Sequence, residues 1–263
     1  MKKILITGAN SYIGTSFEKY IKENYPNDYA IDTVDMIDGS WREKDFSGYD
    51  SVFHVAGIAH QKETKKNAEL YYKVNRDLAI EAAQKAKNDG VKQFVFLSSM
   101  SVYGLDTGVI TKDTVPKPKS NYGKSKLQAE EGIVAFADEN FKVCVIRPPM
   151  VYGTGCKGNY QTLVKISRIS PFFANYINKR SMISIENLSK FVCKTMDKEY
   201  IGLFCPQDPE YVCTCKMIQK IAETMGKNIK LLNILNPIIW ALKCFTKKGK
   251  KAFSDLIYVG WND

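Results

Sequence analysis

Short apolar runs alternate with longer amphipathic stretches over the first 150 residues of the chain. The runs are rich in Val, Ile, Phe and Leu and predict buried strands, at residues 3–6, 30–34, 51–55, 93–98 and 142–146. The stretches between them have helical spacing and predict helices, at about residues 13–24, 68–89 and 121–139. Strands that alternate with helices form a parallel sheet covered on both faces, so the pattern predicts an α/β protein with a doubly wound, Rossmann-type sheet.

The remainder of the chain lacks this regular alternation and predicts a smaller second part. We expect a sheet domain at residues 1–155 and a shortened lobe at residues 156–263 that is interleaved with the core. In the lobe, residues 231–245 are apolar, contain Pro237 as a break, and precede a group of lysines, namely Lys247, Lys248, Lys250 and Lys251. This segment is too short to span a bilayer. Two interpretations stay open: a helix that packs on the lobe, or an interfacial helix whose basic collar contacts a membrane surface weakly.

The composition fits one substantial core in a reducing compartment. The chain has 263 residues, of which 44% are hydrophobic, and its charged start leads straight into the first strand. We therefore expect no signal peptide, no transmembrane segment and a cytoplasmic location. The seven cysteines show no C-x-x-C spacing, Cys213 and Cys215 are too close for an ordinary metal pair, and only His54 and His60 could assist. Free thiols and no metal site are expected.

The formal net charge of +10 raises the question of an acidic partner. Of the 38 basic residues, 33 are lysines spread along the predicted helix faces, which is typical of a solvated surface. No basic stripe is interleaved with aromatic residues, so no nucleic-acid partner is expected. A positive field would also favour a phosphorylated substrate.

The first predicted strand runs directly into a glycine-spaced turn, TGANSYIG at residues 7–14, which opens a helix. Such a turn holds a pyrophosphate because the N–H groups of the first helical turn face the anion. Gly8 permits the tight turn and Gly14 lets the helix pack close to the sheet, whereas Ser11 replaces the middle glycine of the pattern G-x-x-G-x-x-G. Its hydroxyl could donate a hydrogen bond to a phosphate. The turn predicts a dinucleotide site made of Gly8, Asn10, Ser11, Tyr12, Ile13 and Gly14.

Asp35 stands at the end of the second predicted strand, where dinucleotide-binding proteins place an acid that accepts hydrogen bonds from the adenosine ribose. A carboxylate there repels a 2′-phosphate, which favours NAD over NADP. Asp32 lies inside the strand and is the weaker candidate. Arg42 could still accommodate a phosphate, so NADP stays open as the less favoured cofactor.

Tyr122 and Lys126 stand four residues apart in the third predicted helix, so they share one helix face. A nearby ammonium group favours the phenolate, and we expect Lys126 to lower the pKa of Tyr122 toward neutral pH. Ser99 follows the strand at residues 93–98, at the edge of the sheet where ligands bind. We expect it to orient a substrate oxygen and to share a proton with Tyr122, and the alternative is a turn hydroxyl that caps backbone groups.

In combination, these motifs resemble the extended short-chain dehydrogenase/reductase superfamily, and within it the NAD-dependent nucleotide-sugar epimerases and dehydratases. The resemblance covers about residues 1–200. It rests on TGANSYIG, Asp35, FHVAG at 53–57, Asn75, SSMSVYG, YGKSK, RPPMVYG at 147–153 and KRSMISIENL at 179–188.

The resemblance assigns roles to individual residues. Ser99, Tyr122 and Lys126 match the catalytic serine, tyrosine and lysine, with Lys126 also holding the nicotinamide ribose. Arg180 matches an arginine that contacts the pyrophosphate of the sugar nucleotide, and its alternative is a surface arginine. Further cofactor contacts would come from Val55, Ala56, Gly57, Asn75 and Pro148, and Ser101 would join Ser99 on the substrate.

The activity that the resemblance implies is 4-epimerisation of a nucleotide sugar, a UDP-sugar by preference, through a 4-keto intermediate and with NAD as cofactor. A 4-keto-sugar-nucleotide reductase that consumes NAD(P)H, or a dinucleotide sensor without catalysis, would be the alternatives. Met150 replaces an asparagine that many 4-epimerases carry, so the sequence does not identify the sugar.

The resemblance also implies a homodimer, built by a four-helix bundle of the helices at 68–89 and 121–139. Apolar side chains on the first of these helices would support close packing or face the sheet instead, namely Leu78, Ala79, Ala82 and Ala83. The chain is shorter than typical members, mostly in the substrate lobe. Residues 203–206 resemble the last strand of that lobe and residues 216–225 a helix.

Overall fold

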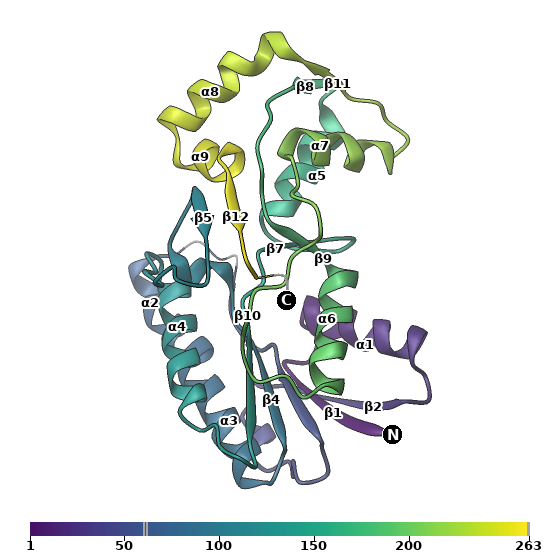
Figure 1. Cartoon of the computed structure of the whole chain (residues 1–263), viewed down its shortest axis with the longest axis vertical. Coiled ribbons are helices and arrows are strands. Elements are labelled where there is room, and N and C mark those ends of the chain that lie inside the picture. The colour runs from purple at the N-terminus through teal and green to yellow at the C-terminus, as the bar shows by residue number, and fades with distance from the viewer. Residues whose placement is uncertain (60, 62, 262–263) are drawn as a thin grey trace.

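A computed structural model describes residues 1–59, 61 and 63–261, except for the side chain of Asn159. Its centre is a parallel sheet in the order β10-β6-β4-β3-β1-β2 (Figure 1). The strands are β1 (Lys2–Thr7), β2 (Tyr29–Val34), β3 (Ser51–His54), β4 (Gln93–Leu97), β6 (Lys142–Ile146) and β10 (Gly202–Phe204). The strand order reverses between β1 and β3, and in such sheets a crevice opens at the carboxyl ends of those two strands. The predicted doubly wound fold is confirmed.

Helices cover both faces of the sheet (Figure 1). On one face, α1 (Tyr12–Asn24) and α6 (Ile185–Asp197) pack together over a core that contains Phe17 and Val192. On the other face lie α3 (Leu78–Asn88) and α4 (Asn121–Val134). The small side chains of α3 are fully buried in the core under this second layer, namely Ala79, Ala82, Ala83 and Ala86. Leu78, the other member of the predicted set, is half-buried against the same core, so the side chains of this stripe pack inside the subunit.

The predicted helix at 68–89 consists of three parts. It begins as α2 (Ala68–Tyr72), widens into a π-helical turn, η3 (Lys73–Asp77), and continues as α3. The π turn carries Asn75, whose side chain is fully buried. Wide turns of this kind recur at functional sites because they redirect one side chain.

The smaller lobe is built from short elements that follow β6 in the chain. Its strand pairs are β7 (Met150–Tyr152) with β9 (Met182–Ser184), and β8 (Phe172–Ala174) with β11 (Lys230–Leu232). Helices α5 (Asn159–Ile169) and α7 (Thr214–Glu223) pack on them around a second core. The described residues also form the 3-10 turns η1 (Ser40–Arg42), η2 (Lys65–Asn67), η4 (Met100–Tyr103) and η5 (Asn233–Leu235).

The C-terminal segment returns to the sheet domain. After α8 (Asn236–Phe245) and α9 (Lys247–Phe253), strand β12 (Leu256–Tyr258) pairs with β5 (Gly108–Ile110). Pro237 lies in the first turn of α8, where a missing N–H costs nothing, so it starts this helix rather than breaking it. Among the described residues, no helix is long and apolar enough to cross a membrane.

One placement differs from the sequence expectation. Residues 203–206 resemble a strand of the substrate lobe, whereas β10 pairs in parallel with β6 and extends the central sheet. The helix α6 likewise belongs to the sheet domain although it follows residue 155. The domain boundary at residue 155 therefore stays a prediction. The chain beyond this residue contributes both to the sheet domain and to the smaller lobe.

Candidate active site

The glycine turn after β1 forms a backbone cradle with no room for a side chain. Gly8 has a φ of +107°, and a Cβ built on it would lie 2.7 Å from the backbone nitrogen of Ala56. The N–H groups of Val55 and Ala56 both donate to the carbonyl oxygen of Thr7, at 3.0 and 2.9 Å. This places the predicted segments 7–14 and 55–57 on the two sides of the crevice.

Ser11 is the N-cap of α1, which explains its departure from the glycine pattern. Its Oγ accepts a hydrogen bond of 3.1 Å from the N–H of Gly14, as serine commonly does at this position. The N–H groups of Tyr12 and Ile13 belong to the first turn and have no acceptor within the helix. No acidic residue lies in that turn. The end of α1 thus keeps the donors and the positive field that a pyrophosphate requires.

Two further residues shape this turn. Asn10 adopts a φ of +63°, a left-handed conformation that asparagine tolerates better than most residues. The ring of Tyr12 lies against the loop after β7, since a Cβ on Gly153 would come within 3.2 Å of the Tyr12 hydroxyl. Burial raises the pKa of Tyr12 to about 12, so it stays a neutral phenol.

The acidic residues of β2 have separate positions. Asp35 follows the carboxyl end of the strand, and its Oδ1 accepts a hydrogen bond of 2.9 Å from the N–H of Ile37. Asp32 instead accepts from the hydroxyl of Tyr49 at 2.6 Å. Arg42 is paired with Glu81, with 2.5 Å between Nη2 and Oε2. The carboxylate of Asp35 therefore lies beside the cradle, while the cation that could accept a 2′-phosphate is held by an acid.

Lys126 is buried beneath the crevice, with an exposed fraction of 4%. Its Nζ donates to the carbonyl oxygen of Leu97 at 2.8 Å and lies 4.6 Å from the ring centre of Phe96. Burial lowers the pKa of Lys126 to about 8, against the opposing effect of Glu130. The lysine is thus a desolvated cation at the carboxyl end of β4.

Gly57 and Asn75 connect this cation to the cradle. A Cβ on Gly57 would lie 2.9 Å from Oδ1 of Asn75 and 3.5 Å from Nζ of Lys126. Asn75 binds both backbone groups of Ile58, accepting at 2.8 Å and donating at 3.1 Å. The amide fixes the backbone that follows β3, so that Gly57, Asn75 and Lys126 meet at one point.

Ser99 and Tyr122 also meet, at the end of β4. Both are half-buried, and a hydrogen bond between their side chains is one of the influences on the Tyr122 pKa. Ser99 additionally caps η4, where its Oγ accepts from the N–H of Ser101 at 3.1 Å and donates to the Ser101 hydroxyl at 3.2 Å. The serine therefore has the turn-capping role of the alternative interpretation together with a contact to the tyrosine.

The structure does not show the expected lowering of the Tyr122 pKa by Lys126. Burial raises the pKa of Tyr122, the hydrogen bond with Ser99 lowers it, and nearby Tyr71 raises it further. Lys126 directs its ammonium group to Leu97 instead. The expectation that a lysine one turn away lowers the tyrosine pKa is wrong for this arrangement, because desolvation of the phenol dominates.

Two residues at Tyr122 escaped the sequence analysis. The carboxylate of Glu63 accepts hydrogen bonds from the N–H groups of Asn121 and Tyr122, at 3.0 and 3.1 Å. The rings of Tyr71 and Tyr122 meet edge to face with their centres 6.5 Å apart. A glutamate in a polar loop gives no pattern from which a cap on a helix 58 residues later could be predicted.

A buried ion pair anchors α4 under the site. Glu130 and Arg147 have side chains that are 7% and 8% exposed and lie 2.5 Å apart between Oε2 and Nη2. Arg147 also donates to the hydroxyl of Tyr103 at 2.9 Å, and Glu130 contacts Ser98. The spacing of Glu130 four residues after Lys126 is the one sequence signal that could have identified it. This network fixes the helix that carries Tyr122.

The remaining candidate residues lie nearby or farther into the lobe. Pro148 is buried and its carbonyl oxygen accepts from the N–H of Met100 at 2.9 Å, while Ser101 is exposed. Arg180 is 9% exposed, and its Nη1 donates to the carbonyl oxygen of Ser254 at 2.9 Å. Burial lowers the pKa of Arg180 against the opposing charges of Asp106 and Asp255. The alternative of a surface arginine is therefore wrong.

The histidines do not point to a metal. His54 is fully buried, its Nδ1 lies 2.8 Å from Oγ1 of Thr7, and burial together with the charge of Lys126 lowers its pKa to about 3. His60 lies outside the described residues. In the part of the chain that the structure describes, no three His, Cys, Asp or Glu side chains gather into a possible metal site.

Comparison with known proteins adds three kinds of finding. A family model described as "NAD dependent epimerase/dehydratase family" matches residues 4–190. The chain is 32% identical to UDP-glucose 4-epimerase of Vibrio cholerae over 97% of its own length and 84% of that protein. It is 24% identical to N-acetyl-alpha-D-glucosaminyl-diphospho-ditrans,octacis-undecaprenol 4-epimerase of Escherichia coli O157:H7, over 89% and 76%. UDP-glucuronic acid 4-epimerase from Bacillus cereus, solved in complex with NAD, has the same fold, with a TM-score of 0.73, 19% identity, and coverage of 99% and 90%.

Proposed function

Because the chain belongs to the NAD-dependent epimerase/dehydratase family, we propose that it inverts the configuration at C4 of a nucleotide sugar with NAD as cofactor. The observation that carries the proposal is the close packing of the first turn of α4, which holds Tyr122, on η4, which Ser99 caps: a Cβ on Gly123 would lie 2.6 Å from the carbonyl oxygen of Ser101. Ser99 and Tyr122 are on the same sheet edge as the Gly8 cradle, where open α/β sheets bind their ligands. The Vibrio cholerae relative, a UDP-glucose 4-epimerase by name, supports a UDP-sugar as substrate.

The residues of the crevice fit NAD. The N-terminus of α1 would bind the pyrophosphate, and Asp35 would accept hydrogen bonds from the hydroxyls of the adenosine ribose. Lys126, Asn75 and Gly57 would hold the nicotinamide end, with Val55, Ala56 and Pro148 along its path. The pairing of Arg42 with Glu81 supports NAD rather than NADP.

The chain's own residues would move one proton. NAD, when bound, would supply the hydride acceptor for C4 of the sugar and, in its reduced form, the hydride donor for the 4-keto sugar. Tyr122 would take the proton of the 4-hydroxyl and later give it back, and Ser99 would orient that oxygen. Lys126 would hold a positive charge beneath the site throughout, since its pKa of about 8 keeps it largely protonated at neutral pH. In the ligand-free protein the raised pKa of Tyr122 keeps the phenol neutral, so the phenolate that takes this proton would form only with the positive charge of bound NAD beside it.

The substrate would extend from Ser99 and Ser101 toward the lobe. Arg180 would contact its pyrophosphate, which requires the guanidinium to exchange or share its hydrogen bond to Ser254. A sugar diphosphate carried on a polyprenol is a second candidate substrate. It is supported by the name of the Escherichia coli relative and by the exposed apolar side chains of α8.

The test compares Tyr122→Phe with the control Tyr49→Phe. Tyr49 lies outside the crevice, where its hydroxyl contacts Asp32. Purified protein is analysed for bound dinucleotide and incubated with UDP-sugars, dTDP-sugars and a polyprenyl-linked sugar diphosphate. We expect Tyr122→Phe to retain NAD and lose turnover by about 10² to 10⁴, and Tyr49→Phe to keep native activity. Stoichiometric consumption of NAD(P)H would establish a reductase instead. A Tyr122→Phe protein with native turnover would refute the proposed chemistry.

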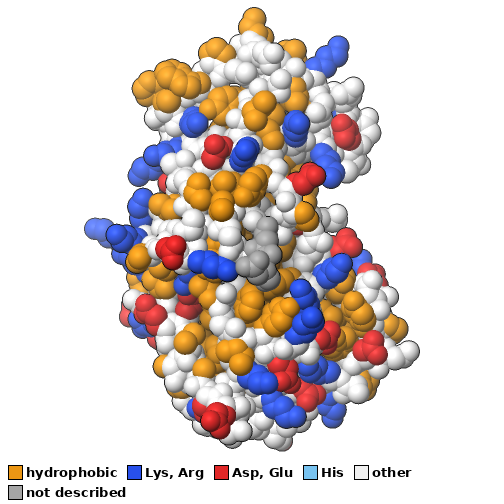
Figure 2. Space-filling view, viewed as in Figure 1, with side chains coloured by type: hydrophobic (Ala, Val, Ile, Leu, Met, Phe, Trp, Pro, Cys, Tyr) orange, Lys and Arg blue, Asp and Glu red, His pale blue; other side chains and the backbone are white. Residues whose placement is uncertain are grey.

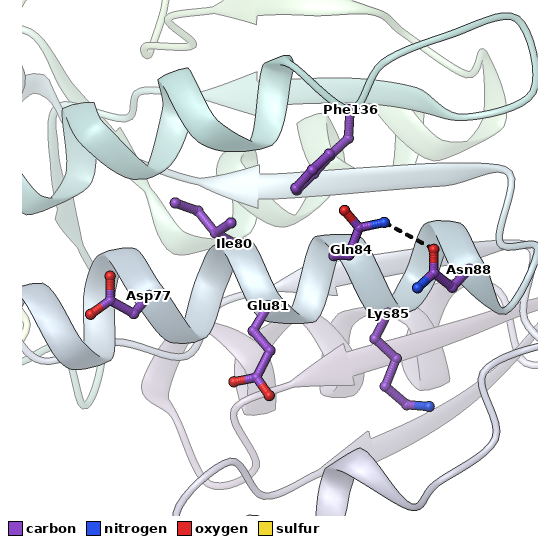
Figure 3. A pocket seen from close by; sticks show the side chains of 7 residues that line it. All are labelled: Asp77, Ile80, Glu81, Gln84, Lys85, Asn88 and Phe136. Atoms are coloured by element: carbon purple, nitrogen blue, oxygen red, sulfur yellow. Dashed lines mark hydrogen bonds between the residues drawn. The ribbon is translucent and has the colours of Figure 1, made fainter.

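We also propose a homodimer formed through α3 and α4, in the cytoplasm. The outer face of α3 carries a pocket lined largely by polar side chains, namely Asp77, Ile80, Glu81, Gln84, Lys85, Asn88 and, after α4, Phe136 (Figure 3). Because the alanines of α3 face the sheet, any contact with a second copy would have to use this polar face. Light scattering at micromolar concentration should give the mass of a dimer, and a monomer mass would count against it.

A further inference from the structure

The basic character of the protein is concentrated in one stretch. Between Glu223 and Asp255 the chain contains seven lysines and no acidic residue, whereas the net charge of the whole chain is +10. The lysines are Lys227, Lys230, Lys243, Lys247, Lys248, Lys250 and Lys251. This stretch contains β11, η5, α8 and α9, at one end of the molecule (Figure 1). A positive surface of this kind attracts an anionic partner.

The same stretch exposes large apolar side chains. Ile234 and Ile238 are 82% and 57% exposed, Leu242 is 40% exposed and Phe245 is 80% exposed. Their spacing of four, four and three residues places them along one side of η5 and α8. Trp240, also on α8, is 58% exposed. Figure 2 shows hydrophobic side chains gathered at this end of the molecule, with basic side chains beside them.

A neighbouring side of α8 is fixed to the lobe. Ile239 is buried in a small core with Ala174 and Phe253. Lys243 donates to the hydroxyl of Tyr176 at 3.0 Å. The helix is therefore folded and oriented by its inner side, and the apolar row on its outer side packs on none of the core clusters of the described residues.

The lysines follow this row directly. Thr246 ends α8 and caps α9 through a hydrogen bond of 2.9 Å from the N–H of Gly249 to its Oγ1. The side chains of Lys247, Lys248, Lys250 and Lys251 are exposed on α9. An apolar row bordered by lysines and free of acids, with Trp240 exposed on another side of the same helix, is the composition of a helix that lies in the interface of an anionic bilayer.

We propose that η5, α8 and α9 form a docking surface for an anionic lipid membrane. Ile234, Ile238, Trp240, Leu242 and Phe245 enter the headgroup region, and the α9 lysines contact the lipid phosphates. The surface lies flat on the bilayer, because α8 has ten residues and cannot cross it. This inference rests on the surface alone and does not depend on the proposed sugar chemistry.

The first experiment measures binding to vesicles. The full-length protein is sedimented with vesicles of phosphatidylcholine alone and of phosphatidylcholine and phosphatidylglycerol in equal parts. We expect binding to the anionic vesicles only, with an affinity that falls as salt is added. Trp240 serves as a reporter because it is 58% exposed, whereas Trp41 is fully buried and the half-buried Trp261 packs against Tyr258, and the emission of Trp240 should shift to the blue on binding. The shift should be absent in Trp240→Phe while that variant still sediments.

Two variants separate the apolar and the electrostatic contributions. The change of Ile238 and Phe245 to Ser should abolish the binding, because both side chains lie on the outer side of α8. Changing the four α9 lysines to Gln should weaken binding by more than about a hundredfold, since each lysine near an anionic surface contributes about fivefold. The matched control changes to Gln four exposed lysines in α1, in α6 and directly after α6, and it should bind as the native protein does. These are Lys19, Lys22, Lys190 and Lys198.

Several outcomes would overturn the proposal. One is equal binding to both kinds of vesicle, and another is equal weakening by the control set, which would reduce the effect to net charge. A native dimer that Ile238→Ser and Phe245→Ser convert to a monomer, without vesicle binding, would make the surface a protein interface. Epimerase activity measured in parallel keeps the two proposals apart, because the outer side chains of α8 should not alter turnover of a water-soluble UDP-sugar.

Discussion

Replacing Lys126 by Met should make the protein more stable and less active. The side chain of Lys126 is 4% exposed, and burial lowers its pKa from 10.5 to about 8. This difference corresponds to about 3 kcal/mol by which folding is penalised at neutral pH, since each pKa unit is about 1.4 kcal/mol. The lost hydrogen bond to the carbonyl oxygen of Leu97 offsets about 1.5 kcal/mol. We expect a net gain of about 1.5 kcal/mol in the free energy of unfolding, or about 3 to 6 °C in Tm.

The dependence on pH makes this prediction specific. Below pH 8 the lysine is protonated in both the folded and the unfolded chain, so the folded protein bears the full cost. Between about 8 and 10.5 only the unfolded chain holds the proton, and the native protein becomes more stable relative to Lys126→Met as the pH rises. The gain of the variant should therefore vanish near about pH 9.5 and reverse above it.

Urea unfolding of both proteins at neutral pH and at about pH 9.5 measures these differences. The control is Lys124→Met, which removes an exposed lysine of the same helix and should change stability little at either pH. NAD binding and turnover should fall in Lys126→Met and stay native in the control. A variant less stable than the native protein at neutral pH, or a difference that does not change with pH, would refute the view of Lys126 as a desolvated cation.

Three further predictions concern the cradle, the ribose contact and the dithiol. Gly8→Ala should weaken NAD binding and cost about 1 to 3 kcal/mol of stability. The control is Gly90→Ala, at a φ of +81° and with no atom within 4 Å of the added Cβ, which should cause the backbone strain without weakening NAD binding. In a titration, Asp35→Ala should weaken NAD binding by about 1 to 3 kcal/mol. A preference of the native protein for NADP would contradict the role of Asp35 at the ribose. The Sγ atoms of Cys213 and Cys215 lie 3.3 Å apart, and the hydrogen bond from Cys215 lowers the pKa of Cys213. Iodoacetamide at about pH 6 should therefore label Cys213 before the six other cysteines, and uniform labelling by mass spectrometry would contradict this.

Local patterns were sufficient to predict the strands that are long and fully buried. The strands β3 and β4 have every residue buried and stand out as apolar runs. By contrast, β10 has three residues, two of them exposed, and its place beside β6 depends on a pairing with residues far away in the sequence. The same limit applies to the π turn at Asn75, because the residue that it directs Asn75 toward, Ile58, lies outside the helical pattern.

The candidate site divides in the same way. Gly8, Ser99 and Asp35 could be located from sequence because each follows a strand, and the carboxyl ends of parallel strands lie at one edge of the sheet. The protonation state of Tyr122 could not be predicted from sequence, since its pKa depends on how deeply the phenol is desolvated beside Tyr71. Spacing shows that two side chains share a helix face, but not which acceptor a lysine chooses in three dimensions.

The proposed membrane surface and the crevice are linked by the last residues of the described chain. The carbonyl oxygen of Ser254, directly after α9, accepts a hydrogen bond from the guanidinium of Arg180. Four residues later, the hydroxyl of Tyr258 donates to the carbonyl oxygen of Arg147 at 3.0 Å, and Arg147 holds Glu130 on the helix of Tyr122. Because β12 is also paired with β5, a displacement of α9 would be transmitted to both arginines rather than absorbed by a free tail. The contacts therefore join the end of α9 both to Arg180, the residue proposed to hold the substrate's pyrophosphate, and to the helix that carries Tyr122.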